Sequence, residues 1–125
     1  MKISFKNFIP GIAWFFTVLY LMCLPGRDLP DVGWLDTFYF DKWVHAGLFA
    51  LLVILLCQPF SNSLFGNKQR LQYFIKITIA VIIWGLTIEF IQKYFIEGRG
   101  FDLLDWAADT IGALIAFWIC KRKFI

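Results

Sequence analysis

Ionisable side chains that could carry acid–base or ligand-binding chemistry stand at a few places in an otherwise apolar chain of 125 residues. Histidine and carboxyl groups can exchange protons, hold a cation or orient a ligand. The candidates lie near the ends of long apolar runs: Asp41, Lys42, His45, Glu89, Gln92, Arg99, Asp105 and Asp109. Because charged groups are costly in apolar surroundings, we expect these side chains to find partners or to serve a function.

The spacing of these residues places them on shared helix faces. Asp41 and His45 are four residues apart and Glu89 and Gln92 are three apart, so each pair lies on one face of a helix. A third face carries acidic and then small residues, namely Asp102, Asp105, Asp109, Gly112 and Ala116. Small residues let helices approach closely. We therefore predict that three helices meet at one polar cluster near the outer membrane boundary.

The elements that must position these side chains are transmembrane helices. Apolar residues make up 60% of the chain and charged residues only 17%, so a soluble domain of this size could not cover its surface with polar groups. At about 20 residues per span, the apolar runs predict four spans, at about 8–24, 43–58, 73–96 and 103–120. We predict an all-α polytopic membrane protein, a bundle of four transmembrane helices that forms a single domain over residues 1–125.

The charges are divided between the two sides of this predicted bundle. One side, which includes a polar connector at residues 61–72, carries eight basic and no acidic residues: Lys2, Lys6, Lys68, Arg70, Lys76, Lys121, Arg122 and Lys123. The other side carries the remaining basic residues and all nine acidic ones. Since lysine and arginine in short loops favour the cytoplasm, we expect a multi-pass protein of the plasma (inner) membrane with both termini cytoplasmic.

Several classes of function are excluded by what the sequence lacks. No nucleophilic serine lies near His45, because Ser61 and Ser63 fall on the opposite side. The segment Gly98-Arg99-Gly100 is too short for a dinucleotide-binding fingerprint. No basic stripe with interleaved exposed aromatic residues indicates nucleic acid. We expect the lipid bilayer as a partner, no nucleic acid and no cofactor.

A metal ion is not the favoured occupant of the cluster. His45 and Glu89, with Asp105 or Asp109, could hold zinc or another divalent cation. The chain has only one histidine, however, and no H-x-x-x-H or H-E-x-x-H spacing, and a single nitrogen ligand is unusual for zinc. We therefore predict no metal site. Acidic residues nevertheless outnumber basic ones at this end, which leaves a bound cation, a shared proton or a cationic partner as ways to balance the charge.

Each prominent residue also has a structural interpretation. His45 could be a hydrogen-bonded structural group or a titrating one. Glu89 could pair with Lys93, Lys42 or Arg99, or it could donate and accept protons in a small outward cavity. Arg99 could anchor the chain at the membrane surface or hold a carboxylate or phosphate.

The ordered set of these segments resembles the VanZ-like family of small bacterial membrane proteins. The resemblance rests on four pieces and extends from Asp41 to Ala116: Asp41-Lys42-x-x-His45, Glu89-x-x-Gln92, Arg99, and Asp105-x-x-x-Asp109-x-x-Gly112. The chain departs from the family pattern at Asp109, where we expect asparagine. The resemblance implies membership of a family whose namesake is associated with low-level resistance to the glycopeptide teicoplanin, and it implies no mechanism.

We favour a non-enzymatic role in the bacterial cell envelope, in which the cluster engages an amphiphilic or lipid-linked ligand at the outer leaflet. By resemblance, this role is linked to antibiotic resistance of the glycopeptide type. The alternative is an intramembrane acid–base enzyme acting on a lipid or lipid-linked envelope precursor, with Glu89 or His45 as acid–base and Arg99 holding a phosphate. In a third interpretation, the cluster only locks three helices together.

Overall fold

The computed structural model of the protein describes residues 5–23, 40–61, 64–96 and 100–125. In chain order its elements are η1 (Phe5–Phe8), α1 (Ile9–Met22), α3 (Phe40–Cys57), η3 (Gln58–Phe60), α4 (Asn67–Phe95) and α5 (Leu103–Phe124). Within the described residues, four helical segments are long and apolar enough to cross a membrane, the first being η1 together with α1. The predicted all-α fold with four membrane-spanning helices is therefore confirmed.

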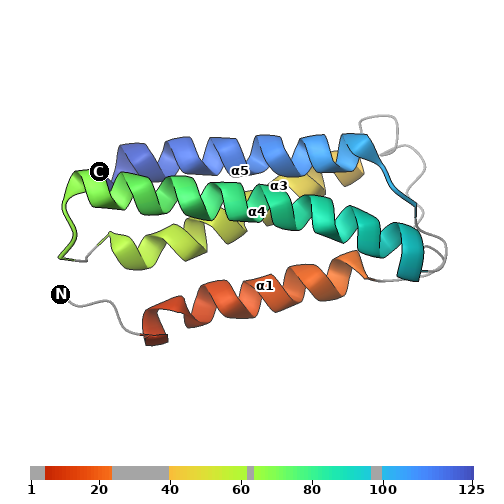
Figure 1. The fold of residues 1–125 in the computed structure, drawn as a ribbon, viewed down its shortest axis with the longest axis horizontal. Coiled ribbons are helices and arrows are strands. Elements are labelled where there is room, and N and C mark those ends of the chain that lie inside the picture. The colour runs from red at the N-terminus through yellow and green to blue at the C-terminus, as the bar shows by residue number, and fades with distance from the viewer. Residues whose placement is uncertain (1–4, 24–39, 62–63, 97–99) are drawn as a thin grey trace.

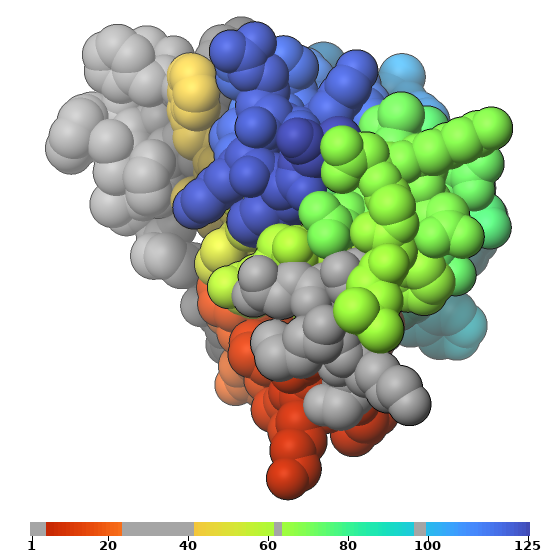
Figure 2. All heavy atoms as spheres, turned by 90° about the vertical axis from the view of Figure 1, so that its left-hand side faces the viewer, coloured from red at the N-terminus to blue at the C-terminus, as the bar shows by residue number. Residues whose placement is uncertain are grey.

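Three of the helices form a compact group. Figure 1 shows α3, α4 and α5 packed along one another, with α1 lying along one side. The chain runs back and forth, so the start of α4 and the end of α5 share one end of the bundle. Figure 2 looks at that end and shows these two segments side by side. There the guanidinium Nη1 of Arg70 donates a 3.3 Å hydrogen bond to the carbonyl of Phe124.

Local sequence explains where several helices begin and end. Pro59 lies in η3, immediately after α3, and proline cannot continue the hydrogen bonding of a helix interior. The backbone N–H of Gly66 donates to the side chain of Gln69 at the start of α4. At the start of α5, the carboxylate of Asp102 accepts a 2.9 Å bond from the backbone N–H of Leu104, which is helix capping.

The helix bounds differ from the predicted spans mainly at α4. That helix begins at Asn67, whereas we predicted a polar connector up to residue 72 and a span from 73. Lysine, glutamine and arginine in this stretch are good helix formers, so the helix continues beyond its apolar part. Its 29 residues extend about 43 Å at about 1.5 Å per residue, which exceeds a hydrocarbon core of about 30 Å. α5 likewise continues past residue 120, to Phe124.

The core lies where α3, α4 and α5 meet. Large side chains are fully buried there, among them Phe49, Leu52, Phe74 and Ile88. α5 contributes small buried residues instead, namely Gly112, Ala113 and Ala116. A Cβ atom at Gly112 would collide with the backbone of Ala46 on α3, so the close approach that we predicted from the small residues is confirmed. Many large apolar side chains outside the core are exposed, as expected for surfaces that face lipid.

α1 is attached to this group more loosely. The indole Nε1 of Trp14 donates a 3.0 Å bond to the carbonyl of Leu48 on α3. An apolar groove of about 170 Å³ lies between α1, α3 and α4. Its lining includes Phe15 of α1, Leu52 of α3 and Trp84 of α4. The helices that carry the ionisable residues are therefore joined mainly to one another, through α5 above all.

Candidate functional site

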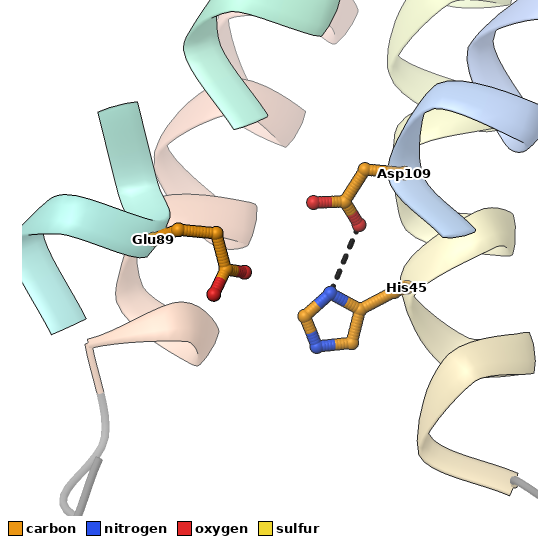
Figure 3. A group of neighbouring side chains, drawn as sticks. All are labelled: His45, Glu89 and Asp109. Carbon is orange, nitrogen blue, oxygen red and sulfur yellow. Dashed lines mark hydrogen bonds and ion pairs between the residues drawn. The ribbon is translucent and has the colours of Figure 1, made fainter. Parts of the chain in front are cut away.

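Ionisable side chains near the start of α3, the end of α4 and the start of α5 come together. Figure 1 shows these helix ends at the end of the bundle opposite the last turn of α5, which is basic. Figure 3 shows His45, Glu89 and Asp109 pointing toward one another from the three helices. All three are buried, and one possible ligand atom from each lies within 4.8 Å of the other two. We call these residues the inner group. Among the described residues, the three helices therefore meet at one group of polar side chains, and its place near the outer membrane boundary stays a prediction.

The imidazole of His45 is held by aspartates of α5. Its Nδ1 and the Oδ1 of Asp109 are 2.9 Å apart, the hydrogen bond drawn in Figure 3. Its Nε2 lies 3.8 Å from the Oδ2 of Asp105. When Asp109 is ionised its oxygen only accepts, so Nδ1 then donates the proton and the neutral ring keeps its lone pair on Nε2. The aspartate thus selects the tautomer of the histidine.

Glu89 and Asp109 each keep one oxygen without a hydrogen bond. The Oε2 of Glu89 accepts a 3.0 Å bond from the backbone N–H of Asp102. Among the described residues, the Oε1 of Glu89 and the Oδ2 of Asp109 are buried and have no hydrogen-bond partner. The side chain of Glu89 is fully buried. The ion pair with Lys93 that we considered is not formed, because Lys93 is exposed and lies over the ring of Tyr94.

A second set of charges lies between the inner group and the surface. The ammonium of Lys42 donates to Asp105 and, at 2.9 Å, to the Oδ2 of Asp102. We call Lys42, Asp102 and Asp105 the outer group. The hydrogen bond from Lys42 lowers the pKa of Asp102, since the cation stabilises the ionised carboxylate. The outer group therefore joins α3 to the start of α5 by charge.

The structure brings together most of the residues that we predicted for the site. Lys42, His45, Glu89, Asp105 and Asp109 all lie in the outer or inner group. Arg99 and the side chain of Asp41 lie outside the described residues, so the roles considered for them stay predictions.

Gln92 does not join the cluster. It is buried, and its Nε2 donates a 2.8 Å hydrogen bond to the carbonyl of Met22, at the end of α1. Three residues along a helix turn about 300°, which leaves Gln92 roughly 60° away from Glu89 around the axis. That offset is enough to direct Gln92 toward α1, whereas Glu89 faces α3 and α5. Gln92 therefore fastens α1 to α4.

Asp102 is a site residue that we placed on the acidic helix face but did not include among the candidate site residues. Its side chain bonds to Lys42, and its backbone N–H bonds to Glu89. The sequence contained two signals for it: an aspartate immediately before an apolar helix start, which is typical of an N-cap, and a spacing of three residues from Asp105. Asp102 therefore links the two groups, and the six residues together form what we call the polar cluster.

Carboxylates dominate the charge of the polar cluster. Four of its residues are acidic, whereas Lys42 and His45 are its only basic members. An ionised carboxylate buried without a counter-charge is costly. The arrangement can therefore hold a cation, share a proton between carboxylates, or transfer a proton through His45.

The chain matches one protein family over nearly its whole length. A family model described as VanZ/LLP1 matches residues 4–124. No curated protein and no solved structure matches the chain. The matched stretch includes every residue of the polar cluster, so the family pattern and the cluster concern the same helices.

Proposed function

The chain belongs to the VanZ/LLP1 family, and on this basis we propose that it is a protein of the bacterial plasma membrane whose polar cluster receives the headgroup of an amphiphilic or lipid-linked molecule. The tail of such a molecule would lie against the apolar side chains around this end of the bundle. The role is one of binding, and the outer group is the part that the headgroup meets first.

The graded exposure of the polar cluster supports this proposal. The exposed fraction of the side chain is 43% for Asp102 and 18% for Lys42, and it falls to zero for Asp109. Charged groups thus continue from the surface into the bundle. Large apolar side chains near the same helix ends are exposed, namely Trp43, Leu103 and Leu104. A molecule with a polar head and an apolar tail complements this combination of surfaces.

The orientation in the membrane is part of the proposal. Lys68 and Arg70 lie at the start of α4, and three basic residues lie in the last turn of α5. Figure 1 shows these two helix ends at the end of the bundle away from the helix ends that carry the polar cluster. By the positive-inside rule, this basic end faces the cytoplasm and the cluster faces outward. Alkaline phosphatase is active only outside the cytoplasm, so a fusion after Ile96 should be active and one after Ile125 inactive. The reverse pattern would overturn the orientation.

By the family resemblance, a lipid-tailed glycopeptide of the teicoplanin type is a candidate ligand. Bacteria that express the chain should then tolerate more teicoplanin than bacteria that do not. The substitutions Lys42→Gln and Glu89→Gln should remove this difference, because they change the outer and inner groups respectively.

The matched control is Lys93→Gln, which removes an exposed charge from the same end of α4 without touching the polar cluster. All variants are compared at equal abundance in the membrane, measured by immunoblot, and as folded protein by size-exclusion chromatography in detergent. Teicoplanin susceptibility that is the same with and without the chain, or the same in all variants, would refute the proposed binding role for this ligand.

The hydrogen bond between Asp109 and His45 favours a second candidate function, an intramembrane acid–base enzyme acting on a lipid or lipid-linked precursor. A carboxylate that fixes the tautomer of an imidazole is a common arrangement for a general base. Purified protein in nanodiscs should then convert phospholipid or lipid-linked precursor with time, and His45→Ala should not. Equal product with both proteins would exclude this candidate.

A further inference from the structure

The inner group places two buried carboxylates beside one histidine with too little positive charge to balance them. Glu89 and Asp109 are both fully buried, and each has one oxygen without a hydrogen bond among the described residues. A carboxylate that is ionised at this depth is costly unless a hydrogen-bond donor or a cation lies beside it. The two unpaired oxygens are therefore buried acceptor atoms that a cation or a proton could occupy.

The described cations do not fill this role. Lys42 bonds to Asp102 and Asp105 in the outer group, and His45 carries at most one positive charge. The two carboxylates of the inner group thus keep a net negative charge whenever both are ionised. A divalent cation would neutralise two carboxylates together, whereas a monovalent one would not.

We infer that the inner group is a binding site for a first-row divalent transition-metal ion, ligated by His45, Glu89 and Asp109. A set of one imidazole nitrogen and two carboxylate oxygens suits ions such as Zn²⁺, Mn²⁺ and Fe²⁺. Mg²⁺ and Ca²⁺ prefer sites made of oxygen alone. Three protein ligands leave at least one coordination position open, as in metal sites that bind further ligands.

The distances in the inner group are close to those that one ion requires. The three candidate ligand atoms lie within 4.8 Å of one another. Ligands that are each about 2.0–2.2 Å from one ion stand at most about 4.4 Å apart. Small side-chain movements would bring the ligand atoms to this spacing. Where Nδ1 of His45 is the ligand atom, it would also give up its proton and its hydrogen bond to Asp109. Figure 3 shows the three polar ends facing a common centre.

Neighbouring residues hold these ligands in place and leave room at them. The backbone N–H of Asp102 binds the Oε2 of Glu89, so the other oxygen stays available. Asp105 approaches the Nε2 of His45 at 3.8 Å. Such contacts outside the ligand set commonly orient metal ligands. On α4, a Cβ atom at Gly85 would lie 3.2 Å from the unpaired Oδ2 of Asp109, so the glycine places no side chain against this buried oxygen.

This spatial grouping supplies what the sequence spacing lacks. The chain has no pair of closely spaced histidines, and the three ligands come from three different helices, so no local motif marks the site. The inference does not require the proposed function, because the metal site needs no headgroup. If the metal site and the proposed binding role both hold, the open coordination position of the ion would bind an oxygen atom of the headgroup.

Metal content of the purified protein tests the inference. The full chain, purified in lipid nanodiscs through a tag without histidine, is analysed by mass spectrometry for metals. It is then stripped with EDTA and titrated with ZnCl₂ or MnCl₂ in equilibrium dialysis. We expect about one ion per chain in the wild type, as the single site requires. Loss of a residue that only orients a metal ligand typically weakens metal binding ~10–100-fold. Glu89→Gln and Asp109→Asn remove ligands themselves, so each should weaken binding by more than this.

The matched control is Gln92→Leu, a buried substitution on α4 that removes no atom of the inner group. It should bind the ion like the wild type even where it lowers stability. A second measurement uses the wild type alone, so it does not depend on whether the ligand variants fold. ZnCl₂ or MnCl₂ should raise the Tm of the wild type, and EDTA should reverse the rise. No ion bound at micromolar ZnCl₂ or MnCl₂, no change of Tm, or unchanged binding in both ligand variants would overturn the metal site. The first two results would indicate a shared proton instead.

Discussion

The backbone of Ala46 on α3 lies so close to Gly112 on α5 that a Cβ atom at residue 112 would stand 2.8 Å from the Cα of Ala46. Ala46 follows His45 in the chain, and Gly112 comes three residues after Asp109. A close approach of the two helices therefore lies next to the 2.9 Å hydrogen bond between His45 and Asp109. The missing side chain at Gly112 sets the helix separation at which the inner group forms.

Gly112→Ala should destabilise the protein because its methyl group must push two helix backbones apart. Overpacking of a tight core costs about 1–3 kcal/mol, and we expect the upper part of that range, since backbone atoms cannot rotate away. Thermal unfolding in nanodiscs measures the change. The control is Gly47→Ala on α3, where a Cβ atom would meet nothing within 4 Å. A Tm for Gly112→Ala as high as that of Gly47→Ala would contradict the close packing.

The helices and most of the site could be predicted because they depend on local patterns. Long apolar runs require membrane spans, and spacings of three and four residues place Asp105 and Asp109 on one helix face. The start of α4 at Asn67 was not predictable from hydropathy. Hydropathy marks the part of a helix within lipid, and α4 continues past it through polar helix-forming residues.

Partners across helices could not be read from the sequence. Glu89 and Gln92 are three residues apart, a spacing that predicts a shared helix face. Glu89 nevertheless bonds to Asp102 at the start of α5, whereas Gln92 binds the carbonyl of Met22. That difference depends on the rotation of α4 about its axis, which packing against three neighbours determines. The grouping of His45, Glu89 and Asp109 depends on the same rotation.

His45 and Asp109 should depend on each other for stability. His45→Leu leaves the carboxylate of Asp109 buried without its hydrogen bond, so it should cost about 1–3 kcal/mol. Asp109→Asn should cost less, because the amide oxygen still accepts from Nδ1 and the buried charge is gone. Unfolding free energies in the presence of EDTA, measured for both single variants and the double variant, give the coupling energy. Additive effects within about 0.5 kcal/mol would contradict the interaction.

Gln92→Leu should loosen the end of α1 while leaving the other helices in place. The substitution removes the 2.8 Å bond to the carbonyl of Met22, and a buried polar group without its partner costs about 1–3 kcal/mol. Cys23, which is partly exposed, adjoins that carbonyl. We expect maleimide to label Cys23 faster in the variant, while the buried Cys57 and Cys120 keep their rates.

The control for this measurement is Gln72→Leu, which changes an exposed glutamine on the same helix. It should leave the labelling rate of Cys23 at the wild-type value. If Gln92→Leu also leaves that rate unchanged, the contact between Gln92 and α1 does not hold α1 in place.

The two carboxylates that share Lys42 should differ in their contribution because they differ in exposure. The side chain of Asp105 is 12% exposed, whereas that of Asp102 is 43% exposed. Asp105→Asn should therefore cost about 1–3 kcal/mol, and Asp102→Asn less than about 1 kcal/mol, since water screens an exposed pair.

Lys42 lowers the pKa of Asp102, so the folded state favours its ionised form. The resulting stability is present above the ordinary pKa of an aspartate and is lost as the pH falls through the lowered value. The difference in Tm between the wild type and Asp102→Asn, followed from pH 7 downward, should be constant at first and then vanish in acid. A difference that grows as the pH falls would have the wrong sign for a carboxylate stabilised by Lys42.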